Sequence, residues 1–418
     1  FQRNRDARGP RIFSDDRRRR GCTLRCRTTP FDIEAAFLML SHRFTRALAG
    51  VGHHMAAHSH HLWPDVTADA HEQYWRDSAA MADNKWAHVL GTVLPEAQQH
   101  IARHLSLPDP GTIAFAPSTH EFIVRIASAL PRGFTLLTTD AEFHSMNRQA
   151  TRWDEAGVAT VVRVAAEPFG TFVDRWTETA TEIQPELMFV SQVFFDSGHI
   201  NSDLSALVNA APAPETIVVI DGYHGFMALP TDLSPIADRA FYLAGGYKYA
   251  MAGEGVCFLH SPPGFIERPV MTGWYAGFGS LADAQVGVPY ASDGSRMSGS
   301  TFDPSGLYRL NAVMRMLSEE SVDAAAMQVH SERLQHHFVA GLETIDTPLN
   351  LTQVVPMWPG PRGRFIAFVH PNAQHLHKAY LDRGLITDVR GDRLRFGFGV
   401  YQDAAHIDTA LHLMDGIV

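Results

Sequence analysis

Two side chains that could act on one small molecule follow two apolar runs in the middle of the chain. The β-branched run at 217–220 predicts a buried strand, and it ends directly at Asp221. A second run at 241–244 leads through two glycines and Tyr247 to Lys248. Ligands of open α/β sheets bind at the carboxyl ends of the strands. We therefore expect Asp221 and Lys248 to converge on one ligand.

A carboxylate and a lysine in this arrangement suit the cofactor pyridoxal phosphate. The lysine amine can form a Schiff base with the aldehyde of the cofactor. The carboxylate can keep the pyridine nitrogen protonated, which makes the ring an electron sink for a substrate carbanion. These two residues alone are equally compatible with a surface lysine after an ordinary strand and an aspartate that caps a helix. The surrounding residues have to distinguish the two possibilities.

Those surrounding residues resemble the class V enzymes that use pyridoxal phosphate (fold type I), and among them the kynureninases most. The motif is Asp-x-x-His at 221–224, followed by Tyr-Lys-Tyr at 247–249 and a glycine-rich turn. The resemblance extends over roughly residues 53–418. It implies an α/β fold in which a large domain with a mostly parallel seven-stranded sheet precedes a small C-terminal α/β domain.

The resemblance also implies a role for each residue of the motif. Lys248 forms the Schiff base, Asp221 contacts the pyridinium nitrogen and His224 lies near the phenolic oxygen of the cofactor. Tyr247 donates a hydrogen bond to the phosphate. On this basis we expect Lys248, Asp221 and His224 to be catalytic.

Two further elements are predicted to contact the cofactor. Ser118 and Thr119 open a predicted helix, where free backbone N–H groups and the helix dipole favour an anion. The resemblance places the phosphate loop here, whereas the alternative is simple capping of the helix by Ser118. It also places Phe143 against the face of the pyridine ring, with a core phenylalanine as the alternative.

A third group of residues implies a homodimer with shared active sites. Gly273 and Trp274 resemble the pair that kynureninases use at the subunit boundary. Ser300 and Thr301 parallel an element that reaches the phosphate of the neighbouring subunit. We therefore expect Trp274, Ser300 and Thr301 to bind cofactor.

Substrate contacts are predicted at both ends of the chain. Arg395 stands where the family binds the substrate carboxylate, a task that suits its planar fork of donors, and a structural ion pair is the alternative. Five histidines occur within residues 53–61, but their spacing differs from that of a zinc-binding helix and no cysteine is near, so no metal site is expected. By position this segment resembles one that enters the active site, which makes Ser59 and His60 candidate substrate contacts.

The departures from the family pattern gather around the substrate. Met146 stands where kynureninases often have aspartate, and Phe194 replaces an asparagine. The histidine expected shortly after Trp274 is missing. Because cofactor contacts set the reaction type broadly and substrate contacts set specificity, the substrate can differ from kynurenine.

Composition excludes several classes of protein. A net charge of −10 disfavours a nucleic-acid partner, which normally needs a basic face. No apolar run approaches the roughly 18 residues of a membrane span. Three cysteines are too few for a disulfide framework, so we expect a cytoplasmic protein.

Four segments are predicted along the chain. Residues 1–28 are rich in arginine and lack apolar periodicity, so we expect a disordered tail. Residues 29–64 form an N-terminal helix and the segment that enters the active site. Residues 65–305 form the large cofactor-binding domain, and residues 306–418 form the small domain.

These expectations leave three outcomes for function. A kynureninase-like hydrolase that cleaves Cβ–Cγ of an amino acid is favoured, and an aminotransferase is the alternative. An inactive protein of the same fold that only binds ligands is disfavoured, because it would not need to keep Asp221, His224, Tyr247, Lys248 and Arg395 together. A desulfurase needs a mobile cysteine, whereas Cys257 falls on a predicted strand and is the only cysteine beyond residue 26.

Overall fold

The computed structural model of the protein describes residues 40–280 and 286–417. The predicted tail at 1–28 and the predicted helix start after residue 29 lie outside these ranges. Among the described residues, no helix is both long and apolar enough to cross a lipid bilayer.

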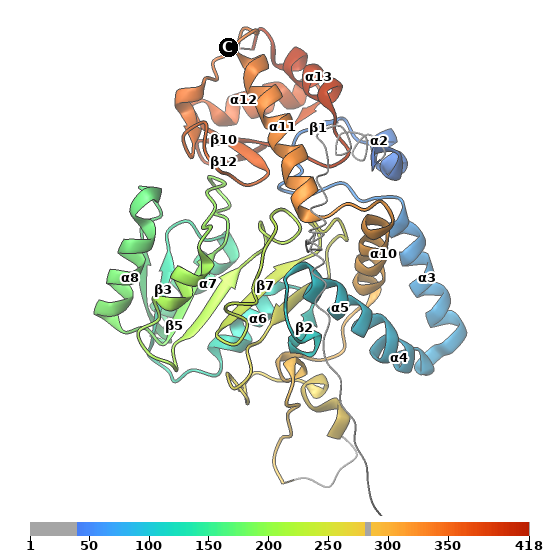
Figure 1. The fold of residues 1–418 in the computed structure, drawn as a ribbon, viewed down its shortest axis with the longest axis vertical. Coiled ribbons are helices and arrows are strands. Elements are labelled where there is room, and N and C mark those ends of the chain that lie inside the picture. Colours follow the sequence, from blue (N-terminus) through green and yellow to red (C-terminus); the bar gives the residue numbers. More distant parts are fainter. Residues whose placement is uncertain (1–39, 281–285, 418) are drawn as a thin grey trace, which may run out of the picture.

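A seven-stranded sheet forms the centre of the large domain (Figure 1), as the sequence predicts. The strand order is β2-β8-β7-β6-β5-β3-β4. Strand β8 runs antiparallel to both of its neighbours, and the other neighbouring pairs are parallel. The strands are β2 (Ile113–Ala116), β3 (Phe134–Thr139), β4 (Ala159–Val164), β5 (Leu187–Ser191), β6 (Ile217–Asp221), β7 (Ala240–Gly245) and β8 (Cys257–His260).

Both faces of the sheet are buried because side chains alternate between two apolar clusters. In β6, Val218 and Ile220 belong to one cluster, whereas Ile217 and Val219 belong to the other. The first cluster is completed by α5 (Leu94–His104), α8 (Phe172–Ile183), α9 (Leu204–Asn209) and α10 (Ser305–Glu319), and the second by α6 (Thr119–Ala127) and α7 (His144–Glu155). A sheet covered on both faces explains why its strands are continuous apolar runs.

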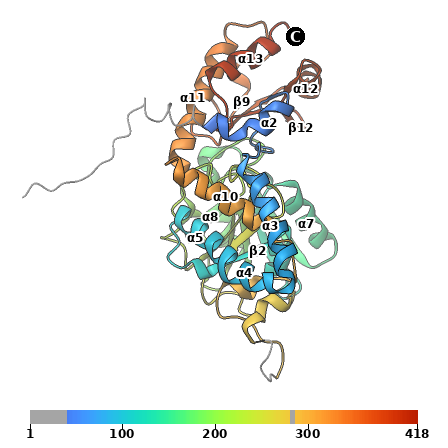
Figure 2. The same ribbon diagram turned by 90° about the vertical axis from the view of Figure 1, so that its right-hand side faces the viewer.

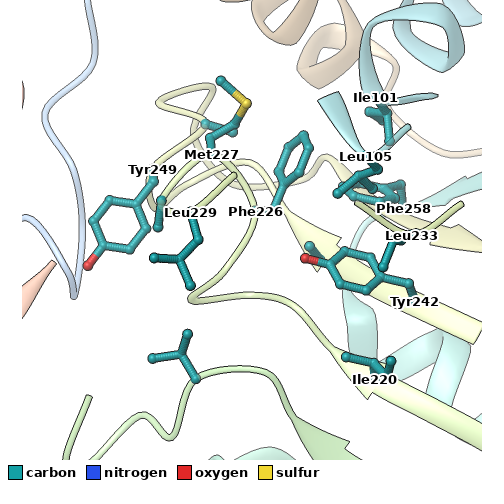
Figure 3. Close-up of a cluster of buried hydrophobic side chains, with 14 of the residues drawn as sticks. Ile101, Leu105, Ile220, Phe226, Met227, Leu229, Leu233, Tyr242, Tyr249 and Phe258 are labelled. Atoms are coloured by element: carbon teal, nitrogen blue, oxygen red, sulfur yellow. The ribbon is translucent and has the colours of Figure 1, made fainter. Parts of the chain in front are cut away.

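The segment between β6 and β7 has neither helix nor strand in residues 222–239, yet it is largely buried. Figure 3 shows Leu233 beside Tyr242 of β7 and near Leu105, which follows α5, with Phe226 close by; Leu229 belongs to the same buried cluster. Gly222 is required where this segment leaves β6, because a Cβ there would lie 1.9 Å from the Tyr242 ring. The segment therefore anchors the end of β6 that carries Asp221.

Helices from both the N-terminal and the C-terminal half of the chain form a layer on one side of the sheet (Figure 2). This layer contains α3 (Val66–Met81), α4 (Lys85–His88), α5 and α10. The buried side chains of α10 belong to the same cluster as those of α5. The short helix α2 (Thr45–Gly50) precedes this layer.

The small domain has an apolar cluster of its own. Its four-stranded antiparallel sheet has the order β12-β13-β10-β9, and its cluster includes Leu334, Phe338 and Phe396. The strands are β9 (Val354–Val355), β10 (Phe365–Val369), β12 (Asp388–Arg390) and β13 (Arg393–Gly397), and the helices are α11 (Ala324–Leu342), α12 (Ala373–Asp382) and α13 (Ala404–Met414). The cluster begins within α11, after α10; the boundary expected at residue 306 stays a prediction.

The N-terminal segment is bound to the small domain. Strand β1 (His53–His54) pairs in parallel with β11 (Leu385–Ile386), and Met55 contributes to the apolar cluster of the small domain. The residues that follow β1 lie beside the end of β13, since Ala56 forms a parallel β-bridge with Gly397.

A buried arginine of α10 holds the backbone that follows Lys248. Arg309 Nε donates to the carbonyl oxygen of Ala252 (2.7 Å) and Nη2 donates to that of Glu254 (2.6 Å). Its Nη1 lies 3.1 Å from His71 Nδ1 on α3. The glycine-rich turn after the lysine is therefore fastened to the helical layer by one side chain.

Arg309→Met should destabilise the protein, because the carbonyl groups of Ala252 and Glu254 lose their charged donor. We expect the free energy of unfolding to fall by about 2–4 kcal/mol in urea titrations. The control is Arg315→Met on the same helix, where the lost partner is Glu96 and the arginine side chain is 58% exposed. That change should cost less than about 1 kcal/mol. Equal losses in the two variants would contradict the prediction.

Candidate active site

A cavity of about 260 Å³ lies at the carboxyl ends of β5, β6 and β7. The parallel register places Ser191 opposite Asp221, and Asp221 opposite Leu243, so these strands end at one edge of the sheet. Asp221 and Lys248 both line the cavity. The structure thus brings together the two residues that were predicted to meet.

Lys248 is buried at 4% exposure, and its Nζ lies 2.5 Å from His224 Nε2. Burial, followed by the positive charge of Arg395, lowers the pKa of Lys248. Burial and the neighbouring Lys248 also lower the pKa of His224 well below its usual range, so its ring is neutral near pH 7. A neutral amine is the form of lysine that attacks an aldehyde.

Asp221 offers a buried carboxylate at the end of β6. Its Oδ1 accepts a hydrogen bond from the backbone N–H of Tyr223 (2.8 Å). Burial raises the pKa of Asp221, while that hydrogen bond and the charge of Lys248 act in the opposite direction. A protonated pyridine nitrogen would supply the positive partner that a buried carboxylate needs.

The helix start at Ser118 faces the same cavity. Ser118 is the N-cap residue of α6, but its side chain makes no capping hydrogen bond, which argues against the simple capping alternative. Ser118, Thr119 and Tyr247 line the cavity. A phosphate group there would meet free N–H groups at the end of the helix.

Phe143 borders the cavity beside the lysine and is only partly buried. The lysine Nζ is 5.5 Å from the centroid of its ring. The ring makes an edge-to-face contact with Phe195, with centroids 5.4 Å apart. A partly exposed ring in this position can stack on a flat ligand, which a core phenylalanine could not do.

Several site residues were missed by the sequence analysis, among them Tyr223 and Glu142. Tyr223 lines the cavity, with its Oη 3.6 Å from the Sγ of Cys257, although it lies within the Asp-x-x-His motif itself. Glu142 is buried beneath the cavity and accepts hydrogen bonds from Thr139 Oγ1 and from the hydroxyl and N–H groups of Ser191. Burial raises the pKa of Glu142 to about 8. A charged residue immediately before Phe143 was the signal that could have identified it.

These features together fit pyridoxal phosphate. Hydroxyl and N–H groups at α6 suit the phosphate, and the Asp221 carboxylate suits the pyridine nitrogen. Phe143 offers a flat face, and the Lys248 amine can reach the aldehyde. The described residues thus provide a suitable group for the phosphate, the pyridine nitrogen, the ring face and the aldehyde of the cofactor.

The dimer-related residues do not reach this cavity within one chain. Trp274 is 42% exposed, and its Nε1 donates to Thr301 Oγ1 (3.1 Å). Neither these residues nor Ser300 line the cavity. A contact of Trp274, Ser300 or Thr301 with the cofactor therefore requires a second copy of the chain.

The histidine-rich segment lies over the loop that carries the lysine. The His60 ring stacks on the Tyr247 ring, with centroids 5.0 Å apart, and Ser59 Oγ lies 3.3 Å from His60 Nδ1. Ser59 and His60 thus lie at the rim of the cavity and not in its wall. In the described ranges, no group of three or more His, Cys, Asp or Glu side chains could hold a metal ion.

Arg395 lies next to the cavity in an ion pair, the setting that was the alternative expectation for it. It is buried at 3% exposure and donates from Nε to Asp388 Oδ2 (2.7 Å). It also donates to the backbone carbonyl of Phe195, which lines the cavity. Arg395 therefore borders the site, as the sequence predicts, but it already contacts a carboxylate of the protein.

Comparisons with known proteins agree with this geometry. The family model for class-V aminotransferases matches residues 55–387. A kynureninase of Deinococcus radiodurans is 27% identical over 340 residues, which cover 76% of this chain and 80% of that protein. The cysteine desulfurase CsdA of Escherichia coli is 23% identical over 295 residues, which cover 67% of this chain and 71% of that protein.

A solved structure shows the same fold. It is a variant of the cystine C-S lyase C-DES with glycine covalently linked to its pyridoxal phosphate cofactor. The TM-score is 0.75 at 16% identity, and the match covers 90% of this chain and 98% of that one. At this identity the likeness supports the fold and not a shared substrate.

Lys248→Ala should abolish covalent trapping of the predicted cofactor. We expect that borohydride reduction of the reconstituted protein leaves a pyridoxyl group on the peptide that contains Lys248, as read by mass spectrometry, because only a Schiff base is reduced to a stable amine. Lys378→Ala is the control, since that lysine side chain is 73% exposed on α12. A pyridoxyl group trapped on the Lys248→Ala protein would contradict the assignment.

Proposed function

The chain belongs to the class-V aminotransferase family of pyridoxal phosphate enzymes, and from this premise we propose that it is a hydrolase of the kynureninase type. Its substrate would be an amino acid with a carbonyl group at Cγ. Water adds to this carbonyl, the Cβ–Cγ bond breaks, and alanine and a carboxylic acid are released. The observation that carries the proposal is the buried lysine, whose pKa is lowered towards neutrality, beside Asp221 in a cavity with aromatic walls.

Those walls suit an aryl or acyl side chain. Phe195 and Val193 line the cavity next to Phe143, whose ring face suits the cofactor. They offer apolar contact to a flat group, which stabilises a bound aryl ring by roughly 1–3 kcal/mol for each well-buried contact residue. The kynureninase similarity over most of the chain supports the same class of substrate.

Lys248, His224 and Asp221 have separate roles in the proposed reaction. When bound, pyridoxal phosphate supplies an aldehyde for the substrate amine and a ring that accepts electrons from the α-carbon. Lys248 Nζ, with its lowered pKa, can take up the proton from Cα near neutral pH. His224 orients this amine without adding a second positive charge, and Asp221 holds the proton on the pyridine nitrogen.

The setting of Cys257 supports hydrolysis ahead of desulfuration. Cys257 is buried at 3% exposure on β8, and burial raises the pKa of its thiol to about 11. A nucleophilic cysteine needs an accessible thiolate, which this residue does not provide. Cys22 and Cys26, the other cysteines of the chain, lie outside the described residues.

Transamination is the alternative outcome at the same site. It would use Lys248 to return the proton to the cofactor and not to the substrate. The aromatic walls favour a large side chain, which transamination does not require. An inactive protein of this fold is disfavoured by the buried charges of Asp221 and Lys248, which are costly to maintain without a ligand.

We further propose a homodimer with shared active sites. Support comes from Trp274, Ser300 and Thr301, which match the family pattern but lie away from the cavity of their own chain. Exposed apolar side chains flank them, with Val270 at 81%, Met271 at 48% and Phe278 at 43% exposure. Such a patch suits burial against a second copy.

A cytoplasmic location stays a prediction from the low cysteine content.

The proposed reaction is tested by supplying L-kynurenine and 3-hydroxykynurenine to the holoenzyme. We expect anthranilate-type products and alanine in equal amounts, measured by liquid chromatography. Parallel reactions contain amino donors with a keto acid, or cysteine and cystine. Amino-group exchange without Cβ–Cγ cleavage would replace the hydrolase by an aminotransferase, and sulfide or persulfide release would replace it by a sulfur-liberating enzyme.

Mixed dimers test the shared sites. Lys248→Ala and Thr301→Arg should each be inactive alone, because one lacks the amine and the other blocks the phosphate side. After mixing and reassembly, half of the dimers are mixed and carry one intact site, so about one quarter of wild-type activity should return. A protein that sediments as an active monomer would contradict the shared site.

A further inference from the structure

The arginine expected to bind the substrate carboxylate is already paired with a carboxylate of the protein. Asp388 on β12 and Arg395 on β13 are direct cross-strand partners. Arg395 donates from Nε and from Nη2 to the same oxygen, Asp388 Oδ2, and from Nη1 to the carbonyl oxygen of Phe195. The pair is almost fully removed from solvent.

These bonds use only part of the guanidinium. An arginine has five N–H groups, one on Nε and two on each terminal nitrogen. The bonds to Asp388 and Phe195 occupy three of them, so within the described ranges one N–H remains on Nη1 and one on Nη2. Two N–H groups match the two oxygens of a single carboxylate.

A second arginine shares Asp388. Arg390 Nη1 lies 2.9 Å from Asp388 Oδ1, so the carboxylate lies between two guanidinium groups. His58 Nε2 lies 3.6 Å from Asp388 Oδ2, and the His58 ring is fully buried without a hydrogen-bond partner among the described residues. Burial lowers the pKa of His58 to about 3, so it adds no charge near pH 7.

Asp388 itself stays ionised. Burial alone would raise its pKa, but the positive charges of Arg395 and Arg390 hold the pKa well below its usual range. The cluster therefore has two positive groups and one permanent negative group. Without Asp388 it would hold two uncompensated guanidinium groups, an arrangement that attracts two carboxylates.

The surroundings of Arg395 favour an apolar ligand. Its Cζ lies 5.8 Å from the ring centroid of Phe195 and 5.6 Å from that of Phe365. A second substrate carboxylate in this space would lose its hydration and meet the charge of Asp388. The other cation of the described site is Lys248, which the cofactor would engage, and Arg390 is already paired with Asp388.

We propose that Asp388 determines the substrate class of the site. The Asp388 carboxylate occupies one edge of the Arg395 guanidinium and leaves two N–H groups for a single substrate carboxylate. Its negative charge repels a second substrate carboxylate. The substrate is accordingly an amino acid with one carboxylate and an uncharged, largely apolar side chain, and dicarboxylic amino acids are rejected. This inference rests on the proposed function only in that the ligand is an amino acid; it holds for hydrolysis and for transamination.

The test measures binding and not turnover, so its result can be interpreted even if the enzyme does not catalyse the proposed reaction. The probes are glutarate and monomethyl glutarate, which have the same chain length and differ by one charge. Their dissociation constants for the holoenzyme are measured by isothermal titration calorimetry. Wild-type protein should bind monomethyl glutarate about tenfold or more tightly than glutarate, and an equal or reversed preference would overturn the proposal.

Variants locate the effect at Asp388. Asp388→Asn removes the charge at nearly constant size and should shift the binding ratio about tenfold or more towards glutarate. Asp388→Glu keeps the charge and should keep the preference for the monoester. Asp382→Asn, an exposed change on α12, is the control and should leave the ratio unchanged. A folded Asp388→Asn protein with the wild-type ratio would also overturn the proposal; should that variant not fold, the wild-type ratio still decides.

Discussion

The burial of an amine and a carboxylate at one edge of the sheet is the constraint on which the rest of the structure depends. Lys248 and Asp221 are both removed from water, and burial moves their pKa values towards each other, downward for the lysine and upward for the aspartate. An isolated buried charge is costly, so such a site persists only where partners are supplied. His224, the backbone N–H of Tyr223 and a cofactor with a cationic ring provide them.

The elements around the site keep this pair in place. Parallel strands bring Asp221 and the residues before Lys248 to one edge, and the buried segment after β6 anchors the aspartate. Arg309 fastens the turn after the lysine to the helical layer. The small domain, joined to the N-terminal segment through β1 and β11, brings Arg395 to the carbonyl of Phe195. The small domain thereby places Arg395 next to the cavity.

The cofactor side and the substrate side of the cavity have different relationships to the family. The residues that suit pyridoxal phosphate follow the family motif closely, whereas Met146, which lines the cavity, departs from it. Phe194 also departs from the motif, but it packs against Phe172 in the apolar core and does not line the cavity. Relatives with this fold include a kynureninase, a cysteine desulfurase and a C-S lyase, so the cofactor side alone is compatible with several reactions. The charge arrangement around Asp388 lies on the substrate side, where such enzymes can differ.

The sequence by itself predicted the strands that end at Asp221 and before Lys248, and its resemblance to a known family implied the seven-stranded sheet and the candidate cofactor residues. Apolar runs end at Asp221 and before Lys248, and strand ends gather at one edge in any parallel sheet, so local patterns sufficed for these residues. Only the tertiary structure decided that Asp388 pairs with Arg395, that Glu142 lies beneath the cavity, and that Trp274 and Thr301 lie away from it in one chain. These contacts join side chains from separate elements, and their distances depend on strand register and packing, which no local pattern encodes.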